Sequence, residues 1–246
     1  MKIALFVFIT LYLSTTTRSE EPIRVAFDMA YKPYMYWSSE ESKASGVYPQ
    51  IIAEIYKRLK IDIEMKPMQW KRAVENAEKN IMGVGGVYKN EQRVKLLDFS
   101  EPIFTEKNFV FVKKGKQFSF QRLEDLKGKL VGVTKGWSYG EEFDSMRAKK
   151  KFNTEESNEI SISFGKLVAG KIDCFIVDVV AADKIITSEK FVGQIDMINT
   201  PAITAEGFLA FGKGENKIEL LKKFNQELIK IKKDGTYDKI IQDSLK

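Results

Sequence analysis

The stretch GGVYKNEQRVKLLDFSEP, residues 85–102, decides the fold. Its leading residues, Gly85 and Gly86, lack a Cβ atom, so the backbone can turn closely around another group there. Arg93 follows among polar residues, and its planar guanidinium suits two-point binding of a carboxylate. The same pattern is typical of a surface turn with a solvated arginine, so the remainder of the chain has to distinguish the two.

Segments typical of strands and of helices alternate on both sides of this stretch. Strands are expected where β-branched residues cluster, and helices where apolar residues recur every three or four positions. Pro67 is expected to end the second strand, and Ser138 with Glu141 has the form of a capping box. The alternation predicts an α/β fold. The predicted strands are 23–27, 61–66, 81–86, 108–112, 130–133, 173–177 and 203–211, and the predicted helices are 48–60, 70–79, 123–127, 138–149, 161–169, 179–188, 218–231 and 237–245.

Polar and aromatic residues follow several of the predicted strands. In open α/β sheets, ligands bind beyond the carboxyl ends of the strands. This common position predicts one binding site that is built from several loops. The residues concerned are Asp28, Trp70, Tyr88 with Arg93, Ser138 and Asp178.

The motif G-x-Y-x-x-x-x-R, followed by D-F-S-x-P, resembles the first-lobe ligand loop of the family 3 periplasmic solute-binding proteins. These proteins are the receptors of amino-acid ABC importers. Four other stretches match the family in the same order, and together the five cover essentially the whole chain after its N-terminal segment. They are IRVAFDMAYKP (23–33), LEDLKGKLVGVTKG (123–136), GKIDCFIVD (170–178) and KDGTYDKI (233–240).

The resemblance implies a two-lobed periplasmic-binding-protein fold of type II, with both lobes α/β and two hinge crossings. The first lobe is expected to comprise residues 20–112 and 205–246, and the second lobe residues 113–204. A monomer of this kind holds a small ligand between its lobes by hinge closure. The closed form would then dock on a membrane ABC permease.

The resemblance also implies roles for two charged residues. Arg93 occupies the position of the arginine that binds the ligand's carboxylate, although a structural ion pair with Asp98 or Glu101 is the alternative. Asp178 occupies the position of the second-lobe aspartate that accepts the α-ammonium group. A strand-terminal aspartate can equally cap the helix that follows it, so this second reading stays open.

Further residues match the family's binding positions less directly. Gly136, Trp137 and Ser138 stand where the family has a turn whose amides help to hold the carboxylate. Ser138 is alternatively a helix cap, and Trp137, which replaces a small residue, either walls the pocket or packs in the core. Tyr31 and Trp70 match aromatic positions against the ligand side chain, although aromatic residues are more often part of the core.

Four positions leave the identity of the ligand open. Asp28 stands where some family members bind a polar ligand side chain, but it is also a typical turn residue. Many members have serine or threonine where this chain has Gly85, Gly86 and Tyr88. The Tyr88 hydroxyl and backbone carbonyls would then replace the missing hydroxyls. A polar amino acid is the expected ligand, and another polar metabolite with a carboxylate is the alternative.

The composition excludes several classes of function. The 246 residues contain no histidine, which removes Ser-His-Asp and Cys-His catalysis and most transition-metal sites. The single cysteine, Cys174, cannot form an internal disulfide and is expected to be a buried structural residue. The net charge of +6 is small and spread along helix faces, so nucleic acid is not an expected partner. No cofactor and no metal are expected.

Residues 1–19 are typical of a secretory signal peptide. Lys2 supplies a positive charge, residues 3–13 form an apolar run, and residues 14–19 are mostly small and polar. The run is too short to span a bilayer, and no second hydrophobic stretch follows it. We therefore expect export of the protein to the periplasm and cleavage after Ser19.

The sequence thus predicts an exported solute-binding protein rather than an enzyme. Two alternatives use the same fold. One is a periplasmic dehydratase-like enzyme, which without histidine needs an aspartic or glutamic acid of raised pKa as its general acid. The other is a ligand-sensing subunit that acts in trans on a separate kinase.

Overall fold

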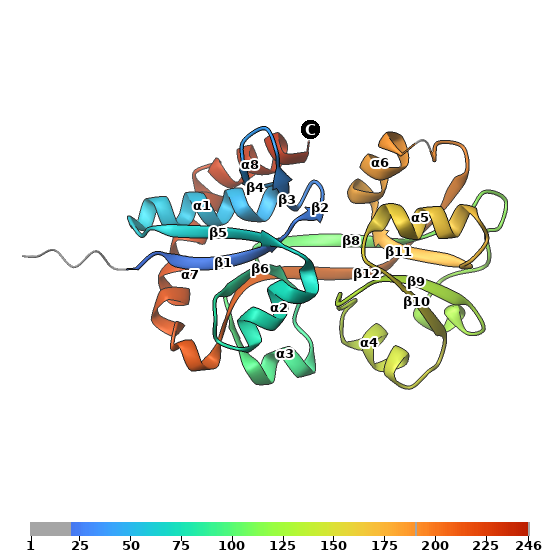
Figure 1. The fold of residues 1–246 in the computed structure, drawn as a ribbon, viewed down its shortest axis with the longest axis horizontal. Helices are drawn as coiled ribbons and strands as arrows, with labels where there is room; N and C mark the ends of the chain where they lie inside the picture. The colour runs from blue at the N-terminus through green and yellow to red at the C-terminus, as the bar shows by residue number, and fades with distance from the viewer. Residues whose placement is uncertain (1–20, 190, 246) are drawn as a thin grey trace, which may run out of the picture.

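The computed structural model describes residues 21–189 and 191–245, and the predicted signal peptide, residues 1–19, lies outside them. Two α/β lobes lie side by side and are joined by a pair of long strands (Figure 1). The main strands form one mixed sheet in the order β10-β9-β11-β8-β12-β6-β1-β5, with β7 paired to β12. The two-lobed α/β fold expected from the sequence is confirmed.

The first lobe is built around β1 (Ile23–Asp28), which pairs in parallel with β5 (Ile63–Met68) and with β6 (Gly83–Val87). Helices α1 (Val47–Leu59) and α2 (Trp70–Glu78) connect these strands and lie on opposite sides of the sheet (Figure 1). The other elements of this lobe are β2 (Ala30–Tyr31), β3 (Met35–Ser38), β4 (Lys43–Ser45), α3 (Glu91–Leu96), β7 (Leu97–Phe99), a 3₁₀ turn (Lys213–Glu215), α7 (Ile218–Lys233) and α8 (Thr236–Leu245).

The second lobe is built around β9 (Leu130–Thr134), which pairs in parallel with β10 (Asn153–Ser157) and β11 (Cys174–Asp178). Helix α6 (Val179–Ser188) occupies the predicted range. Helix α5 (Ile160–Val168) ends two residues before Gly170, which adopts the positive φ of a glycine that terminates a helix. The remaining elements are a 3₁₀ turn (Leu123–Leu126) and α4 (Glu141–Ala148).

The chain crosses between the lobes through β8 (Phe104–Lys113) and β12 (Ile195–Gly212), which pair antiparallel along most of their length. In the second lobe β8 also pairs with β11, and in the first lobe β12 pairs with β6 and β7. The two expected hinge crossings are these strands. Both expected lobe boundaries fall within these strands, after residue 112 in β8 and after residue 204 in β12.

The prediction that Pro67 ends the second strand is wrong, because β5 continues through it to Met68. Strand β5 is at the end of the sheet order, next to β1 alone. A proline has no N–H to donate, but an edge strand has one side that makes no ladder hydrogen bonds. Pro67 is therefore tolerated where a central strand would exclude it.

Short elements around residues 30–45 and 91–96 were not predicted. The small sheet β2-β3-β4 consists of strands of two to four residues, and α3 has six residues, so neither displays a full period of its pattern. Helix α3 begins where the side chain of Asn90 accepts a hydrogen bond from the backbone N–H of Arg93. Arg93 consequently lies on a helix and not in an open loop.

Buried apolar side chains fill both lobes. Phe27, Ile51 and Phe224 are among those that the first lobe buries completely, and Phe143 is one that the second lobe buries. Cys174 lies in the core of the second lobe, where burial raises the pKa of its thiol to about 12. The expectation of a buried structural cysteine is confirmed.

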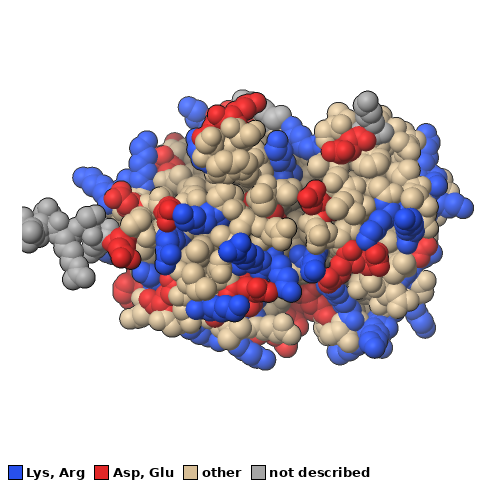
Figure 2. All heavy atoms as spheres, viewed as in Figure 1, with Lys and Arg blue, Asp and Glu red and all other residues tan. Residues whose placement is uncertain are grey.

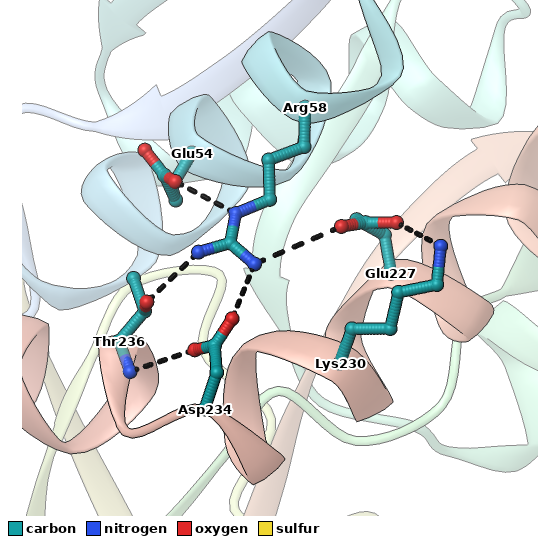
Figure 3. A network of polar contacts seen from close by, with 6 residues as sticks. All are labelled: Glu54, Arg58, Glu227, Lys230, Asp234 and Thr236. Atoms are coloured by element: carbon teal, nitrogen blue, oxygen red, sulfur yellow. Dashed lines mark hydrogen bonds and ion pairs between the residues drawn. The ribbon is translucent and has the colours of Figure 1, made fainter.

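A polar network joins α1 to the C-terminal helices on the outer side of the first lobe (Figure 3). Arg58 of α1 donates through Nε to Glu54 at 2.8 Å, through Nη1 to Asp234 at 2.6 Å and through Nη2 to Thr236 at 2.8 Å. Its Nη1 also lies 3.8 Å from Glu227. One guanidinium thus links α1 to the end of α7 and the start of α8.

We expect Arg58→Met to lower the melting temperature by a few degrees, because it leaves the carboxylates that converge on Arg58 without their cation. Thermal unfolding followed by circular dichroism checks this. Lys57→Met is the matched control, since Lys57 is exposed on the same helix and its loss should leave the melting temperature nearly unchanged. Equal melting temperatures for the two variants would show that the network adds no stability.

Candidate functional site

The sequence-predicted residues meet where the two lobes face each other. A cavity of about 20 Å³ lies at this place, enough for about one water molecule. Seven of the nine predicted residues line it, and Asp28 and Asp178 are buried nearby. The lining residues are Tyr31, Met35, Trp70, Gly86, Tyr88, Arg93, Trp137 and Ser138.

A wider groove of about 1030 Å³ continues from the cavity, between α2 and α3 of the first lobe and α4 of the second. Arg93, Trp137 and Ser138 line both the cavity and the groove. Figure 2 shows that acidic and basic side chains are intermixed over both lobes on the face displayed. The groove is likewise lined by both signs of charge, among them Lys71, Glu78 and Arg147.

Arg93 is 6% exposed and directs its guanidinium at backbone carbonyls. Nη1 donates to the Tyr88 oxygen at 2.9 Å, and Nη2 donates across the lobe boundary to the Gly136 oxygen at 3.2 Å. The ion pairs within residues 21–189 and 191–245 do not include Arg93. The alternative of a structural pair with Asp98 or Glu101 is therefore wrong. Burial lowers the pKa of this guanidinium.

Asp178 ends β11 and is 2% exposed. Its Oδ1 accepts hydrogen bonds from the backbone N–H groups of Val180 at 2.8 Å and Ala181 at 3.2 Å, so it caps α6. The same oxygen accepts a hydrogen bond of 2.6 Å from the hydroxyl of Tyr34, which belongs to the first lobe. Burial raises the pKa of this carboxyl. Asp178 thus acts as a helix cap and also faces the opposite lobe.

Asp28 ends β1 and is also buried. Its Oδ1 accepts from the backbone N–H of Ala30 at 2.9 Å, which is the turn role considered from the sequence. Burial raises the pKa of Asp28 to about 6, although the Ala30 N–H and the Trp137 side chain of the second lobe oppose the rise.

The turn that carries Trp137 needs a glycine at its centre. Gly136 has a φ of +79°, and an added Cβ would lie 3.0 Å from the Cβ of Lys71 on α2. This close approach lets the Trp137 ring enter the first lobe, where its centroid lies 4.5 Å from that of Tyr31 in an edge-on arrangement. The indole thus packs against a site residue.

The predicted capping box of Ser138 and Glu141 is wrong. Helix α4 begins at Glu141 after Gly140, whose φ of +89° turns the chain, so Ser138 lies too early to cap it. Ser138 instead donates its hydroxyl proton to the Asp144 carboxylate. Glu141 accepts a hydrogen bond of 2.9 Å from the backbone N–H of Glu91 on α3, which is a further contact between the lobes.

Glu106 is a site residue that the sequence did not reveal. It lies on the crossing strand β8, is 1% exposed and accepts hydrogen bonds from the hydroxyls of Tyr31 and Tyr48. Tyr88, which lines the cavity, also helps to lower the pKa of this carboxyl. Burial raises the pKa of Glu106 to about 7, against the effect of the tyrosine hydroxyls.

A weak signal for Glu106 exists in the sequence. Glu106, Asn108 and Val110 are spaced by two and are buried, whereas Thr105 before them and Lys107 among them are exposed. Alternate residues of a strand share one face of the sheet, so Glu106 belongs to the buried set. A predicted strand beginning only at residue 108 had concealed this alternation.

Within residues 21–189 and 191–245, no group of histidine, cysteine, aspartate and glutamate side chains could hold a metal ion. Over the same residues, no helix is both long and apolar enough to cross a membrane.

Comparison with known proteins identifies the class. Residues 23–245 match the bacterial extracellular solute-binding proteins, family 3. Because the match covers nearly all of the sequence, this chain belongs to that family. The resemblance inferred from the five sequence stretches is confirmed.

Individual relatives agree with this assignment. The L-cystine-binding protein TcyJ of Escherichia coli strain K12 is 26% identical over 220 residues, which are 86% of this chain and 78% of that protein. An ancestral arginine-binding protein solved with bound arginine has a TM-score of 0.76 at 28% identity, covering 92% of this chain and 98% of its own. A histidine kinase sensor domain has a TM-score of 0.80 at 20% identity, covers 92% and 97%, and shares the fold.

The raised pKa values make stability depend on pH. Glu106 binds its proton more tightly in the folded chain than in the unfolded chain, so unfolding releases a proton between about pH 4.5 and 7. Stability is therefore expected to fall as the pH rises through this window, and Asp28 adds to the fall up to about pH 6. One such group contributes a slope of at most about 1.4 kcal/mol per pH unit.

We expect Glu106→Gln to flatten this slope. The melting temperature of the variant relative to that of the wild type should therefore rise between pH 5 and pH 8. Thermal unfolding across that range in the absence of added ligand measures it. Glu101→Gln is the matched control, because Glu101 is an exposed glutamate of the same segment. Parallel pH profiles for the wild type and Glu106→Gln would contradict a raised pKa at Glu106.

Proposed function

We propose that this protein captures an amino acid between its lobes, with Arg93 binding the carboxylate and Asp178 binding the ammonium group. One observation carries the proposal. A buried guanidinium and a buried carboxylate, supplied by opposite lobes, have only neutral hydrogen-bonding partners among the described residues. Burying an unpaired charge is costly, and a zwitterion would supply the counter-charge of each.

The ligand is a polar amino acid in this proposal. Tyr31, Trp70 and Trp137 supply aromatic surface for its side chain, and Asp28 supplies a hydrogen-bond acceptor. The names of the relatives support this class, since one is described as binding L-cystine and another as binding arginine. The turn from Gly136 to Ser138 and the backbone at Gly86 complete the wall.

The physiological role that we propose is delivery of the ligand to an ABC importer. The protein would be exported to the periplasm after cleavage near Ser19 and would act as a monomer that closes about the β8–β12 hinge. Membership of an extracellular solute-binding family supports this role. The similarity to a kinase sensor domain supports a sensing role in trans as the alternative.

A dehydratase-like enzyme is the second candidate. Such an enzyme needs a carboxyl group that is protonated near neutral pH. Burial raises the pKa of Asp28 to about 6 and that of Glu106 to about 7, so this fold contains groups of the required kind. Incubation with carboxylated ring compounds, followed by mass analysis, separates the candidates, because a binding protein returns its ligand unchanged.

We expect Arg93→Ala to weaken amino-acid binding by about 30-fold to 3000-fold. Removing one partner of a buried charge pair costs about 2–5 kcal/mol, and about 1.4 kcal/mol corresponds to a tenfold change. The ligand is first identified by a thermal-shift screen of the amino acids, and titration calorimetry then compares the variant with the wild type. Arg72→Ala is the matched control, since Arg72 is an exposed arginine of the same lobe. Retained affinity in Arg93→Ala would end the assignment.

A further inference from the structure

The groups assigned to ligand binding already have partners from the opposite lobe. Arg93 donates to the Gly136 carbonyl at 3.2 Å, which is where a ligand carboxylate would accept. Asp178 accepts from the Tyr34 hydroxyl at 2.6 Å, which is where an ammonium group would donate. Asp28 is buried nearby, and the Trp137 ring of the second lobe packs against Tyr31 of the first.

We propose that Tyr34 and Trp137 are intramolecular competitors of the ligand, and that Trp137 limits the size of the ligand side chain. The proposal rests on the proposed function, because it uses the same cleft. Both residues make contacts between the two lobes inside the empty cleft, and a ligand binds by displacing them.

Tyr34 is held firmly in the competing position. It is 2% exposed, and its ring lies 5.0 Å from that of Tyr31 and 5.6 Å from that of Phe104. Packing on two sides fixes the direction of its hydroxyl, so the bond to Asp178 costs little further entropy. A hydroxyl is a weaker partner for a carboxylate than an ammonium group, so a ligand ammonium can replace it.

Trp137 fills the side-chain end of the cleft. The centroid of its indole ring lies 4.5 Å from that of Tyr31 and 6.1 Å from that of Tyr139. The cavity that remains is about 20 Å³, which is the space of about one water molecule. Any ligand with a long side chain therefore requires the indole to leave.

These contacts join the two lobes, so they form only when the lobes are closed. They favour the closed arrangement before any ligand enters. A ligand must displace them, so the observed binding is weaker by the free energy of the contacts that are lost. Tyr34 and Trp137 therefore weaken ligand binding, whereas the residues of an ordinary pocket wall strengthen it. Removing a wall weakens binding, whereas removing a competitor strengthens it.

Small-angle scattering without ligand tests the closed arrangement. We expect Trp137→Ala to have a larger radius of gyration than the wild type, because the ring contact between Trp137 and Tyr31 across the cleft is lost. Trp37→Ala is the matched control, since Trp37 is 42% exposed on β3 and lies outside the site. An unchanged radius for Trp137→Ala would overturn the proposal, and this test does not depend on which ligand binds.

Titration calorimetry tests the competition with glycine as a small probe and L-arginine as a large one. We expect Trp137→Ala to bind L-arginine about tenfold more tightly than the wild type, with a smaller gain for glycine. Tyr34→Phe keeps the ring but removes the hydroxyl, and it should strengthen binding of both probes. Weaker binding in both variants would make these residues ordinary ligand contacts and overturn the proposal. Absence of amino-acid binding in the wild type and in every variant would instead overturn the proposed function, and the scattering result would still decide whether the cleft closes upon itself.

Discussion

The antiparallel pairing of β8 with β12 is the constraint on which the rest of the structure depends. Pairing runs from Ile195 opposite Lys113 in the second lobe to Gly207 opposite Phe104 in the first. Because each strand also pairs with its own lobe's sheet, the ladder fixes the position of both lobes. Register shifts on both sides of Pro201 interrupt it, and such irregularities let a strand bend. The cleft is the space that this arrangement leaves between the lobes.

The cleft concentrates buried charge beside this ladder. Glu106 lies on β8 itself, Asp178 lies opposite Asn108 of the same strand, and Arg93 approaches from α3. Neutral hydroxyl and carbonyl groups form hydrogen bonds with these charged side chains. The hydrogen bonds make burial of the side chains possible but do not neutralise their charge. Such groups respond strongly to an incoming charge and to pH, because a low-dielectric environment strengthens every electrostatic interaction. The ligand binding that we propose and the expected pH sensitivity therefore have the same physical origin.

Much of the fold was predictable because it depends on local patterns. The alternation of strands and helices, the range of α6 and the glycine that ends α5 all follow from periodicity and from residues adjacent in sequence. The placement of most site residues followed from their position after strands. Predictions that needed the neighbours of a segment were wrong, since the sequence does not say that β5 is an edge strand or that Gly140 turns the chain before α4.

The sequence by itself predicted the α/β class and the placement of Arg93 and Asp178 together beyond strand ends, because these features depend on local patterns and on position along the chain. The two lobes followed from the resemblance of five stretches to a known family. Only the tertiary structure decided which groups meet these residues. Tyr34 reaches Asp178 across 144 positions of sequence, and Tyr31 reaches Glu106 across 75. The first pair joins the two lobes that the β8–β12 ladder holds together, the second links Tyr31 to the ladder itself, and burial raises the pKa of each carboxyl. No local pattern encodes a partner at that distance.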